Sequence, residues 1–246
     1  MRARPWHPTA TAADLAWDAT LRAAASHGPG RARRLRVRKA DLRRKERRAR
    51  QAHLVLFVVD GSWSMAVARR MEATKGAVLA LLTQAYQRRD WVGLITFRRD
   101  RAELVLPPTR SVMLARRALA DLPVGGKTPL AAGLHLAQRV VARTRRAHPD
   151  LRPLVVLLTD GAGNVPLQPG HDPMDDAYQV AERLAAARVP AVVVNLEHPQ
   201  FDQGLAAELA RRLRAPVYRL PALQADALVR TVRRALAEGE TAAARR

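Results

Sequence analysis

From residue 51 onward, short apolar runs alternate with longer amphipathic segments. The run at 54–59 (LVLFVV) is apolar throughout and rich in β-branched residues, which is typical of a strand buried on both faces. The same pattern predicts further strands at 91–97, 102–106, 153–160, 191–196 and 216–220. Helical periodicity predicts helices at 69–87, 111–121, 130–147, 174–188 and 223–237.

This order of elements indicates an α/β fold. Strands that alternate with helices are joined by crossovers, and such crossovers make neighbouring strands parallel. The strands on either side of RRDR, residues 98–101, are separated by a turn too short for a crossover, so they form a hairpin. We therefore expect a doubly wound, Rossmann-like and mostly parallel sheet, with one antiparallel edge strand and helices on both faces.

The first fifty residues do not show this alternation of apolar runs and amphipathic segments. Residues 11–25 show a helical pattern with Thr11 as a candidate N-cap, and SHGPG at 26–30 breaks it. Residues 31–50 hold twelve Arg or Lys and only two acidic residues, a net charge of +10. We expect a basic N-terminal extension at 1–50 with one helix at 11–25, an α/β domain at 51–237 and a flexible tail at 238–246.

Composition narrows the class of protein. The 246-residue chain is 48% hydrophobic, which supports a sizeable core, and it has no cysteine, so disulfides and thiolate metal sites are excluded. The N-terminus lacks the apolar segment of a signal peptide, and no run approaches the roughly 18 apolar residues of a membrane span. We expect a soluble, cytoplasmic protein that makes no membrane contact.

Polar residues stand where two of the predicted strands end. Asp60 follows one buried run and Asp160 another, so both should lie at the carboxyl edge of the sheet, where open α/β sheets bind ligands. Ser62 and Ser64 follow Asp60 at alternate positions and would point the same way in an extended segment. Hard oxygen ligands of this kind suit Mg²⁺ or Mn²⁺.

Three other kinds of site fit the sequence poorly. A nucleophile elbow needs glycine two residues before its serine, and neither serine of DGSWS has one. The segment GGKTPL at 125–130 resembles the end of a P-loop, but Asp121 stands where the first glycine is required, and Pro129 follows. The histidines show no metal-ligand spacing.

The pattern DGSWS, then Thr128 in GGKTPL, then Asp160 in LLTDG resembles the metal-ion-dependent adhesion site of von Willebrand factor A domains. The resemblance covers roughly residues 51–237. It implies that Ser62 and Ser64 bind Mg²⁺ directly and that Thr128 binds directly or through water. Asp60 and Asp160 would act mainly through water and by orienting the hydroxyls. One coordination position would remain for a carboxylate of a partner protein.

Two residues beside this motif are candidates for partner docking. Trp63 stands where members of the family usually have glycine, and its ring could anchor a partner, obstruct the metal or cover the loop. Lys127, next to Thr128, could point toward the ion or toward solvent.

A narrower resemblance concerns the C-terminal A domain of the D-type subunits of magnesium chelatase and of related cobaltochelatases. It rests on LVLFVVDGSWSMA, AYQRRDWVGLITFR, AELVLPPTRSV, LPVGGKTPLAAGL and LLTDGAGNVPL, and on the segment that precedes them. It implies a non-catalytic interaction subunit that works with an AAA+ ATPase and a large chelatase subunit in tetrapyrrole biosynthesis. Since the sequence contains no Walker motif, we expect no ATP hydrolysis and no chelation by this chain alone.

Two alternative functions remain open. The domain could serve another AAA+ ATPase in a chaperone-like role. The basic segment 31–50 could draw nucleic acid by counterion release, but it has no interleaved aromatic residues, which favours a solvated arm that faces an acidic partner.

Overall fold

The computed structural model describes residues 2–5, 15–26, 37–46, 52–62, 90–111, 113–114, 117–118, 125–197 and 200–219. The chain divides into two compact units, Met1–Arg50 and Gln51–Arg246. The predicted helices at 69–87 and 223–237, most of the one at 111–121 and the tail at 238–246 lie outside the described residues. Within the described residues, no helix is long and apolar enough to cross a membrane.

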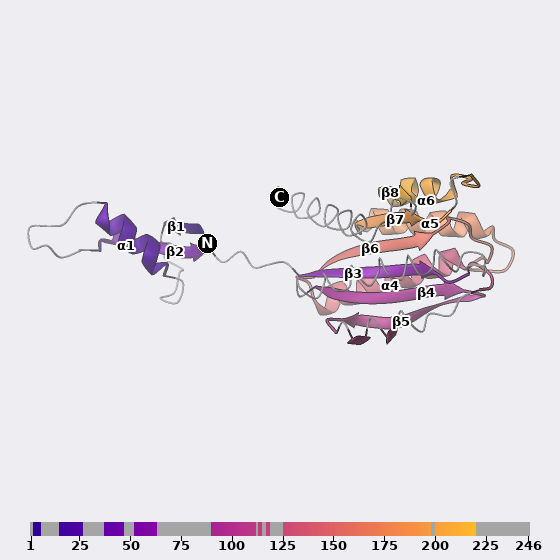
Figure 1. Cartoon of the computed structure of the whole chain (residues 1–246), viewed down its shortest axis with the longest axis horizontal. Helices are drawn as coiled ribbons and strands as arrows, with labels where there is room; N and C mark the ends of the chain where they lie inside the picture. Colours follow the sequence, from indigo (N-terminus) through magenta and orange to yellow (C-terminus); the bar gives the residue numbers. More distant parts are fainter. Residues whose placement is uncertain are drawn as a thin grey trace, which may run out of the picture. The chain divides into compact units, whose positions relative to one another are not determined.

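The first unit contains the antiparallel strands β1 (Arg2–Pro5) and β2 (Arg43–Glu46), the helix α1 (Trp17–Ala25) and a short 3₁₀ helix (Lys39–Asp41) (Figure 1). The helix predicted at 11–25 begins only at Trp17. Leu15 forms a β-bridge with Arg44, and the Ala16 amide donates to the Arg43 carbonyl at 2.7 Å. The residues just before the helix therefore pair with β2 rather than continuing the helix.

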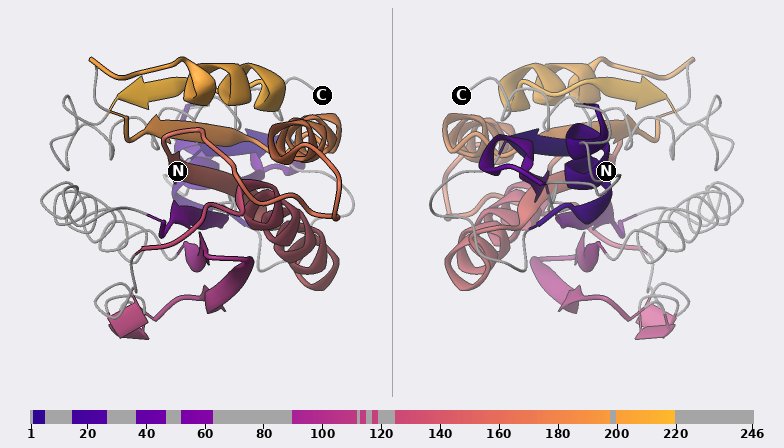
Figure 2. Two further views of the ribbon diagram at one scale, coloured as in Figure 1. Left: turned by 90° about the vertical axis from the view of Figure 1, so that its right-hand side faces the viewer. Right: turned by 90° about the vertical axis from the view of Figure 1, so that its left-hand side faces the viewer.

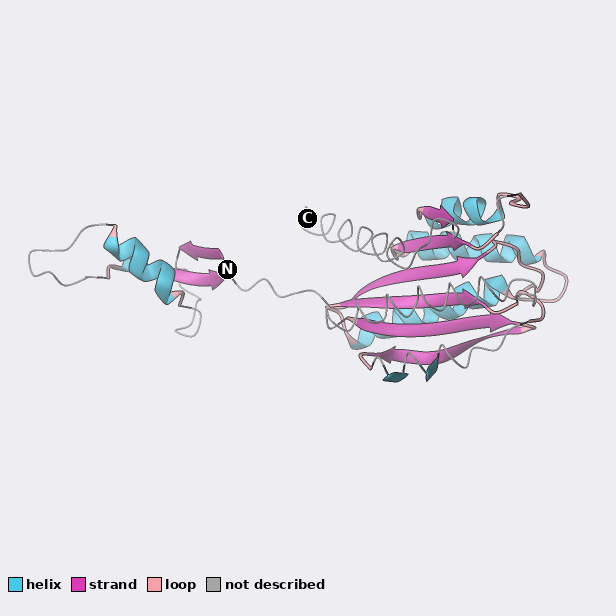
Figure 3. Ribbon diagram, in the orientation of Figure 1, coloured by secondary structure: helices cyan, strands magenta, loops and turns pink. Residues whose placement is uncertain are grey.

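The second unit is built on one mixed sheet. In the described residues its strands are β3 (His53–Asp60), β4 (Trp91–Arg98), β5 (Arg101–Thr109), β6 (Arg152–Thr159), β7 (Ala191–Asn195) and β8 (Val217–Arg219). They are ordered β5-β4-β3-β6-β7-β8, and every neighbouring pair is parallel except β4–β5 (Figure 3). The mostly parallel sheet with an antiparallel edge strand, predicted from the sequence, is confirmed.

The edge strand β5 is longer than the sequence predicts. The predicted strand ends at residue 106, and the two residues that follow, Pro107 and Pro108, cannot donate to a sheet ladder. The strand continues through both prolines to Thr109, with register shifts in its pairing with β4. An edge strand tolerates proline because its outward-facing amides have no partner strand.

Three described helices flank the sheet: α4 (Leu130–Ala147), α5 (Pro173–Ala186) and α6 (Leu205–Leu213). Figure 2 shows α4 and α5 side by side on one face, and α6 packs against α5 and β7. The sequence prediction missed α6, a short helix whose buried residues (Ala206, Leu209, Ala210 and Leu213) recur at helical spacing. Between these helices and the sheet lies one continuous apolar core.

Helix α4 approaches β4 closely at Gly133. A methyl group there would lie 2.6 Å from the Cδ1 atom of Phe97, whose ring is completely buried. Alanine is normally the better helix former by about 1 kcal/mol. This glycine is therefore kept by packing rather than by helix propensity.

Gly133→Ala is expected to lower the free energy of unfolding by about 1 to 3 kcal/mol, because the added methyl overpacks a rigid core. Chemical denaturation measures the change. Ala142→Gly, at an exposed position of the same helix, is the matched control and should cost about 1 kcal/mol through helix propensity alone. An unchanged or raised stability of Gly133→Ala would contradict the packing account.

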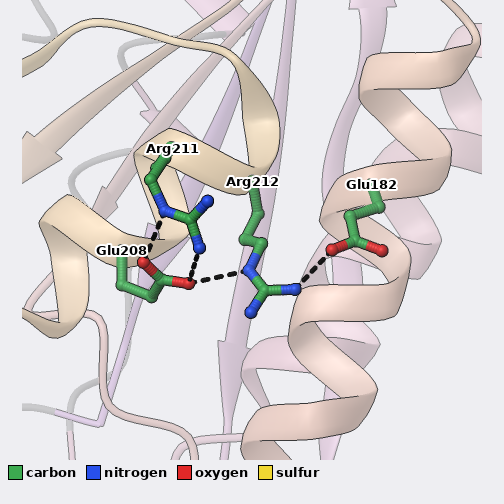
Figure 4. Close-up of polar contacts among 4 residues, drawn as sticks. All are labelled: Glu182, Glu208, Arg211 and Arg212. Carbon is green, nitrogen blue, oxygen red and sulfur yellow. Dashed lines mark hydrogen bonds and ion pairs between the residues drawn. The ribbon is translucent and has the colours of Figure 1, made fainter.

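A surface network fastens α6 to α5 (Figure 4). Arg212 donates to Glu208 on its own helix at 2.7 Å and to Glu182 on α5, and its guanidinium lies 4.9 Å from the Tyr178 ring centroid. Hydrogen bonds from Arg211 and Arg212 lower the pKa of Glu208 to about 2. These groups are exposed or half-buried, so water and salt screen much of the attraction, and the buried side of α6 contributes more to its docking.

Candidate metal centre

Asp60 ends β3 with its side chain completely buried. One carboxylate oxygen accepts hydrogen bonds from the amide of Ser62 at 2.9 Å and from its hydroxyl at 2.6 Å. The other accepts from the hydroxyl of Thr159 at 3.2 Å. The carboxylate thus orients a serine hydroxyl of its own loop and is held from the neighbouring strand β6.

Asp160 follows β6 directly and lies at the same edge, because β3 and β6 are parallel neighbours with Val59 opposite Leu158. Its carboxylate accepts from the amide of Ala162 at 2.9 Å. The Thr159 hydroxyl that donates to Asp60 also accepts from the Gly161 amide at 3.0 Å. The two strand ends are therefore joined through Thr159.

The loop before α4 reaches both strand ends. The amide of Gly125 donates to the carbonyl of Gly61 at 2.7 Å, which ties this loop to the one after β3. The amide of Thr128 donates to the side chain of Asn164 at 2.7 Å, and the Asn164 amide donates back to the Thr128 carbonyl at 3.0 Å. Thr128 is buried, and these bonds hold it between the loops that carry Asp60 and Asp160.

Burial disfavours the ionised form of both carboxylates. Burial, the largest cause, and the charge of Asp160 together raise the pKa of Asp60 to about 7, against the lowering effect of the hydrogen bonds from Ser62 and Thr159. Burial also raises the pKa of Asp160. A cation bound at this edge would relieve both effects, since a nearby positive charge favours the ionised form.

Arginine side chains flank these loops. A methyl group on Gly61 would lie 3.4 Å from Cβ and Cδ of Arg98, and one on Gly126 would lie 2.8 Å from Cγ of Arg99. Arg98 and Arg99, at the β4–β5 turn, therefore pack against the loop after β3 and the loop before α4. Lys127 is exposed.

Four of the five predicted metal residues, Asp60, Ser62, Thr128 and Asp160, lie on these joined loops. Ser64 and Trp63 lie outside the described residues. Within the described residues, no three His, Asp or Glu side chains form a metal-binding group. The polar side chains on these loops are two carboxylates and the hydroxyls of Ser62 and Thr128, a set of hard oxygen donors of the kind that Mg²⁺ and Mn²⁺ prefer.

The sequence prediction missed two supporting residues and one buried hydroxyl beside them. Thr159 bridges the two strand ends, and Asn164 holds Thr128 in place. The Thr96 hydroxyl is buried with no hydrogen-bond partner among the described residues, and a methyl group on Gly61 would lie 2.9 Å from it. Thr159 could have been suspected from its place just before Asp160. Thr96 lies in an apolar run and gives no such signal.

Comparisons with known proteins agree with this architecture. Residues 55–162 match the family model of the von Willebrand factor type A domain, and residues 1–47 match that of the AAPxQ domain. The solved structure of the SpRpn10 VWA domain aligns with a TM-score of 0.54 at 19% identity, covering 74% of this chain and 94% of that one.

Three relatives cover most of the chain. It is 48% identical over 215 residues to the uncharacterized protein Rv2850c of Mycobacterium tuberculosis, covering 87% of this chain and 33% of that protein. It is 45% identical over 218 residues to the magnesium-chelatase 60 kDa subunit of Cereibacter sphaeroides, covering 85% and 38%. It is 36% identical over 166 residues to the uncharacterized protein MJ0910 of Methanocaldococcus jannaschii, covering 67% and 94%.

The mixed sheet, the polar edge and these matches define one class of protein: the chain belongs to the von Willebrand factor type A domain family. Within that class it is similar to magnesium-chelatase subunits over most of its length. The chain spans about a third of the length of Rv2850c and of the chelatase subunits that it matches.

Proposed function

We propose that the chain binds Mg²⁺ through Asp60, Ser62, Ser64, Thr128 and Asp160 and uses the ion to dock a carboxylate of a partner protein. The observation that carries the proposal is the joining of three separate loops at one sheet edge. The Asp60–Thr159 bond links two of them, and the Gly125–Gly61 and Thr128–Asn164 bonds bring in the third.

The donor set favours docking over catalysis. When bound, the ion would supply a Lewis-acidic position for an incoming carboxylate. Serine and threonine hydroxyls neutralise little of its charge, so that carboxylate would gain strongly from the contact. The role of Asp60 is to orient the Ser62 hydroxyl, from which it already accepts a hydrogen bond at 2.6 Å. Docking through a metal ion in this way needs no acid–base pair and no nucleophile.

We further propose that the partner is an AAA+ ATPase, and that the protein is a non-catalytic subunit of a magnesium or cobalt chelatase-type complex in tetrapyrrole biosynthesis. Similarity to several magnesium-chelatase subunits supports this role. The large chelatase subunit would be the second partner. In this scheme the protein acts in the cytoplasm, and the basic segment 31–50 faces an acidic surface of a partner.

A Mg²⁺-dependent pull-down tests the proposal. A tagged AAA+ subunit of a magnesium chelatase is expected to retain the full chain in Mg²⁺ and to release it in EDTA. Ser62→Ala should weaken retention about tenfold or more, because it removes one metal ligand and the hydrogen bond to Asp60. Arg183→Gln, an exposed substitution on α5, is the control and should behave like the natural protein.

Two results would reject parts of the proposal. Retention that survives both EDTA and Ser62→Ala would show that the metal does not mediate docking. Co-purification with a different AAA+ ATPase, and none with the chelatase ATPase, would discard the chelatase role in favour of a chaperone-like one. Trp63→Ala and Lys127→Gln in the same assay would show whether either residue contributes to the contact.

A further inference from the structure

A second surface lies at the opposite end of the sheet from the metal centre. A groove of about 810 Å³ opens between α4 and the β4–β5 edge. Trp91, which lines the groove, begins β4, whereas Asp60 pairs with Phe97 near the other end of that strand. Six residues of extended chain span about 20 Å, so the groove is separate from the metal loops.

The floor of the groove is apolar. Helix α4 and the strands β4 and β5 contribute its side chains, which are Trp91, Leu104, Pro107, Pro108, Leu136 and Val140. Apart from Val140 these side chains remain partly or largely open to solvent. Apolar side chains of another molecule that covered this floor would remove its surface from water, which favours binding.

The rim of the groove is cationic. Arg139, Arg143 and Arg146 line the groove and follow the spacing i, i+4, i+7, which puts them on one stripe of α4. None of the three forms an ion pair within the described part of the chain, and no carboxylate lines the groove. Like charges at this spacing repel one another, so the stripe weakens the isolated helix.

Arg145 differs from the three rim arginines because its side chain is hydrogen-bonded to the rest of the fold. Arg145, on the same helix, donates to the carbonyls of Ala187 and Arg188 at 3.0 and 3.1 Å and so supports the fold. The three rim arginines make no such bond within the described part of the chain. Their arrangement around an apolar floor is suited to an anionic molecule that also carries apolar groups.

Trp91 argues against a nucleic acid base as the occupant. His148 lies 4.8 Å from its ring centroid, and the guanidinium of Arg110 lies 5.1 Å from it. Trp91 is also the only Trp, Tyr or Phe among the described residues that line the groove, whereas single-stranded nucleic acid binding normally stacks successive bases on several aromatic side chains. The indole Nε1 is buried with no acceptor among the described residues.

We propose that this groove docks an acidic amphipathic segment of a partner protein, with apolar side chains on the floor and carboxylates on the arginine stripe. Charge complementarity favours such an acidic segment over two other occupants. The segment 31–50 of this chain carries a net +10, and a second copy of the chain carries +21. The contact needs no metal, so it is independent of the proposed Mg²⁺ site.

Fluorescence anisotropy with a labelled peptide tests the groove. The full chain, in EDTA and about 150 mM salt, is titrated against the acidic amphipathic peptide EELDDLFEEL and against EESDDSQEES, which has the same charge but no apolar residues. We expect the first peptide to bind about tenfold more tightly, because it alone covers the floor. Arg139→Gln/Arg143→Gln should weaken its binding about tenfold.

The control is Arg183→Gln/Arg214→Gln, which removes the same charge from exposed positions outside the groove and should change the affinity by less than about twofold. Equal affinity for the two peptides, or equal loss in the two double variants, would overturn the proposal in favour of diffuse charge attraction. Binding of a short DNA duplex with the same sensitivity to Arg139→Gln/Arg143→Gln would assign the surface to nucleic acid instead.

Discussion

Saturating Mg²⁺ is expected to raise the thermal unfolding midpoint of the protein and to leave that of Asp60→Asn unchanged. A ligand that binds only the folded state at about a hundred times its dissociation constant adds roughly 2.7 kcal/mol. For a chain of this length that corresponds to a shift of about 5 °C or more. Asparagine keeps the size of Asp60 and can still accept from Ser62, but it removes a buried charge from the centre.

The same substitution should stabilise the protein when no divalent ion is present. Burial raises the folded-state pKa of Asp60 to about 7, well above the ordinary 3.8 of an unfolded chain. The folded state therefore disfavours the ionised carboxylate, and this loss of stability is fully present only above pH 7. Removing the charge should restore about 1 to 4 kcal/mol in EDTA.

Differential scanning calorimetry in EDTA and in Mg²⁺ measures both effects, and isothermal calorimetry with Mg²⁺ and Mn²⁺ measures binding directly. Asp150→Asn, at an exposed turn after α4, is the matched control and should respond to Mg²⁺ like the natural protein. If Asp60→Asn gained as much from Mg²⁺ as the natural protein does, the metal site would not lie at Asp60.

Gly161→Ala is expected to destabilise the protein by about 3 to 5 kcal/mol. Gly161 follows Asp160 with φ +90°, and a methyl group there would lie 2.2 Å from the Ala206 nitrogen and 2.5 Å from the Leu205 carbonyl carbon. Both atoms belong to the backbone of the first turn of α6, which cannot rotate away as a side chain could. The helix would have to move off the sheet edge.

Two causes contribute to the loss expected at Gly161, the strain of a positive φ and the clash with α6, and Gly170→Ala separates them. Gly170 has almost the same φ, +87°, but a methyl group there would meet nothing within 4 Å. Its substitution should cost only about 1 to 2 kcal/mol, the strain of a left-handed residue. Chemical denaturation of both variants gives the comparison, and equal losses would show that the contact with α6 does not matter.

Several parts of the fold could be predicted because the local pattern of apolar residues, or the length of a turn, was enough to specify them. The run at 54–59 within β3 is apolar throughout and rich in β-branched residues, and all eight residues of the strand are buried. The RRDR turn is too short for a crossover connection, so the antiparallel pairing of β5 with β4 could be predicted. The predicted start of α1 is too early, because the pairing of Leu15 with Arg44 joins residues far apart in the sequence.

The supporting part of the metal centre was harder to predict. Asp60 and Asp160 each follow a buried run directly, so their places at strand ends could be inferred. The partners of these residues gave no comparable signal. Asn164 meets Thr128 across thirty-six positions of sequence, and Thr159 meets Asp60 across ninety-nine. A hydrogen bond of that range depends on which strands become neighbours, and composition and periodicity carry little of that information.

By itself, therefore, the sequence determined the α/β class, the two acidic strand ends and the charge of the chain, because local hydrophobic pattern and residue type are enough for these. Only the tertiary structure decided that the loop with Thr128 meets both strand ends, that α6 rests on Gly161 and that the arginines of α4 border an apolar groove. Each of these depends on packing between segments distant in the chain, where sterics and long-range hydrogen bonds select one arrangement among many that the same local preferences allow.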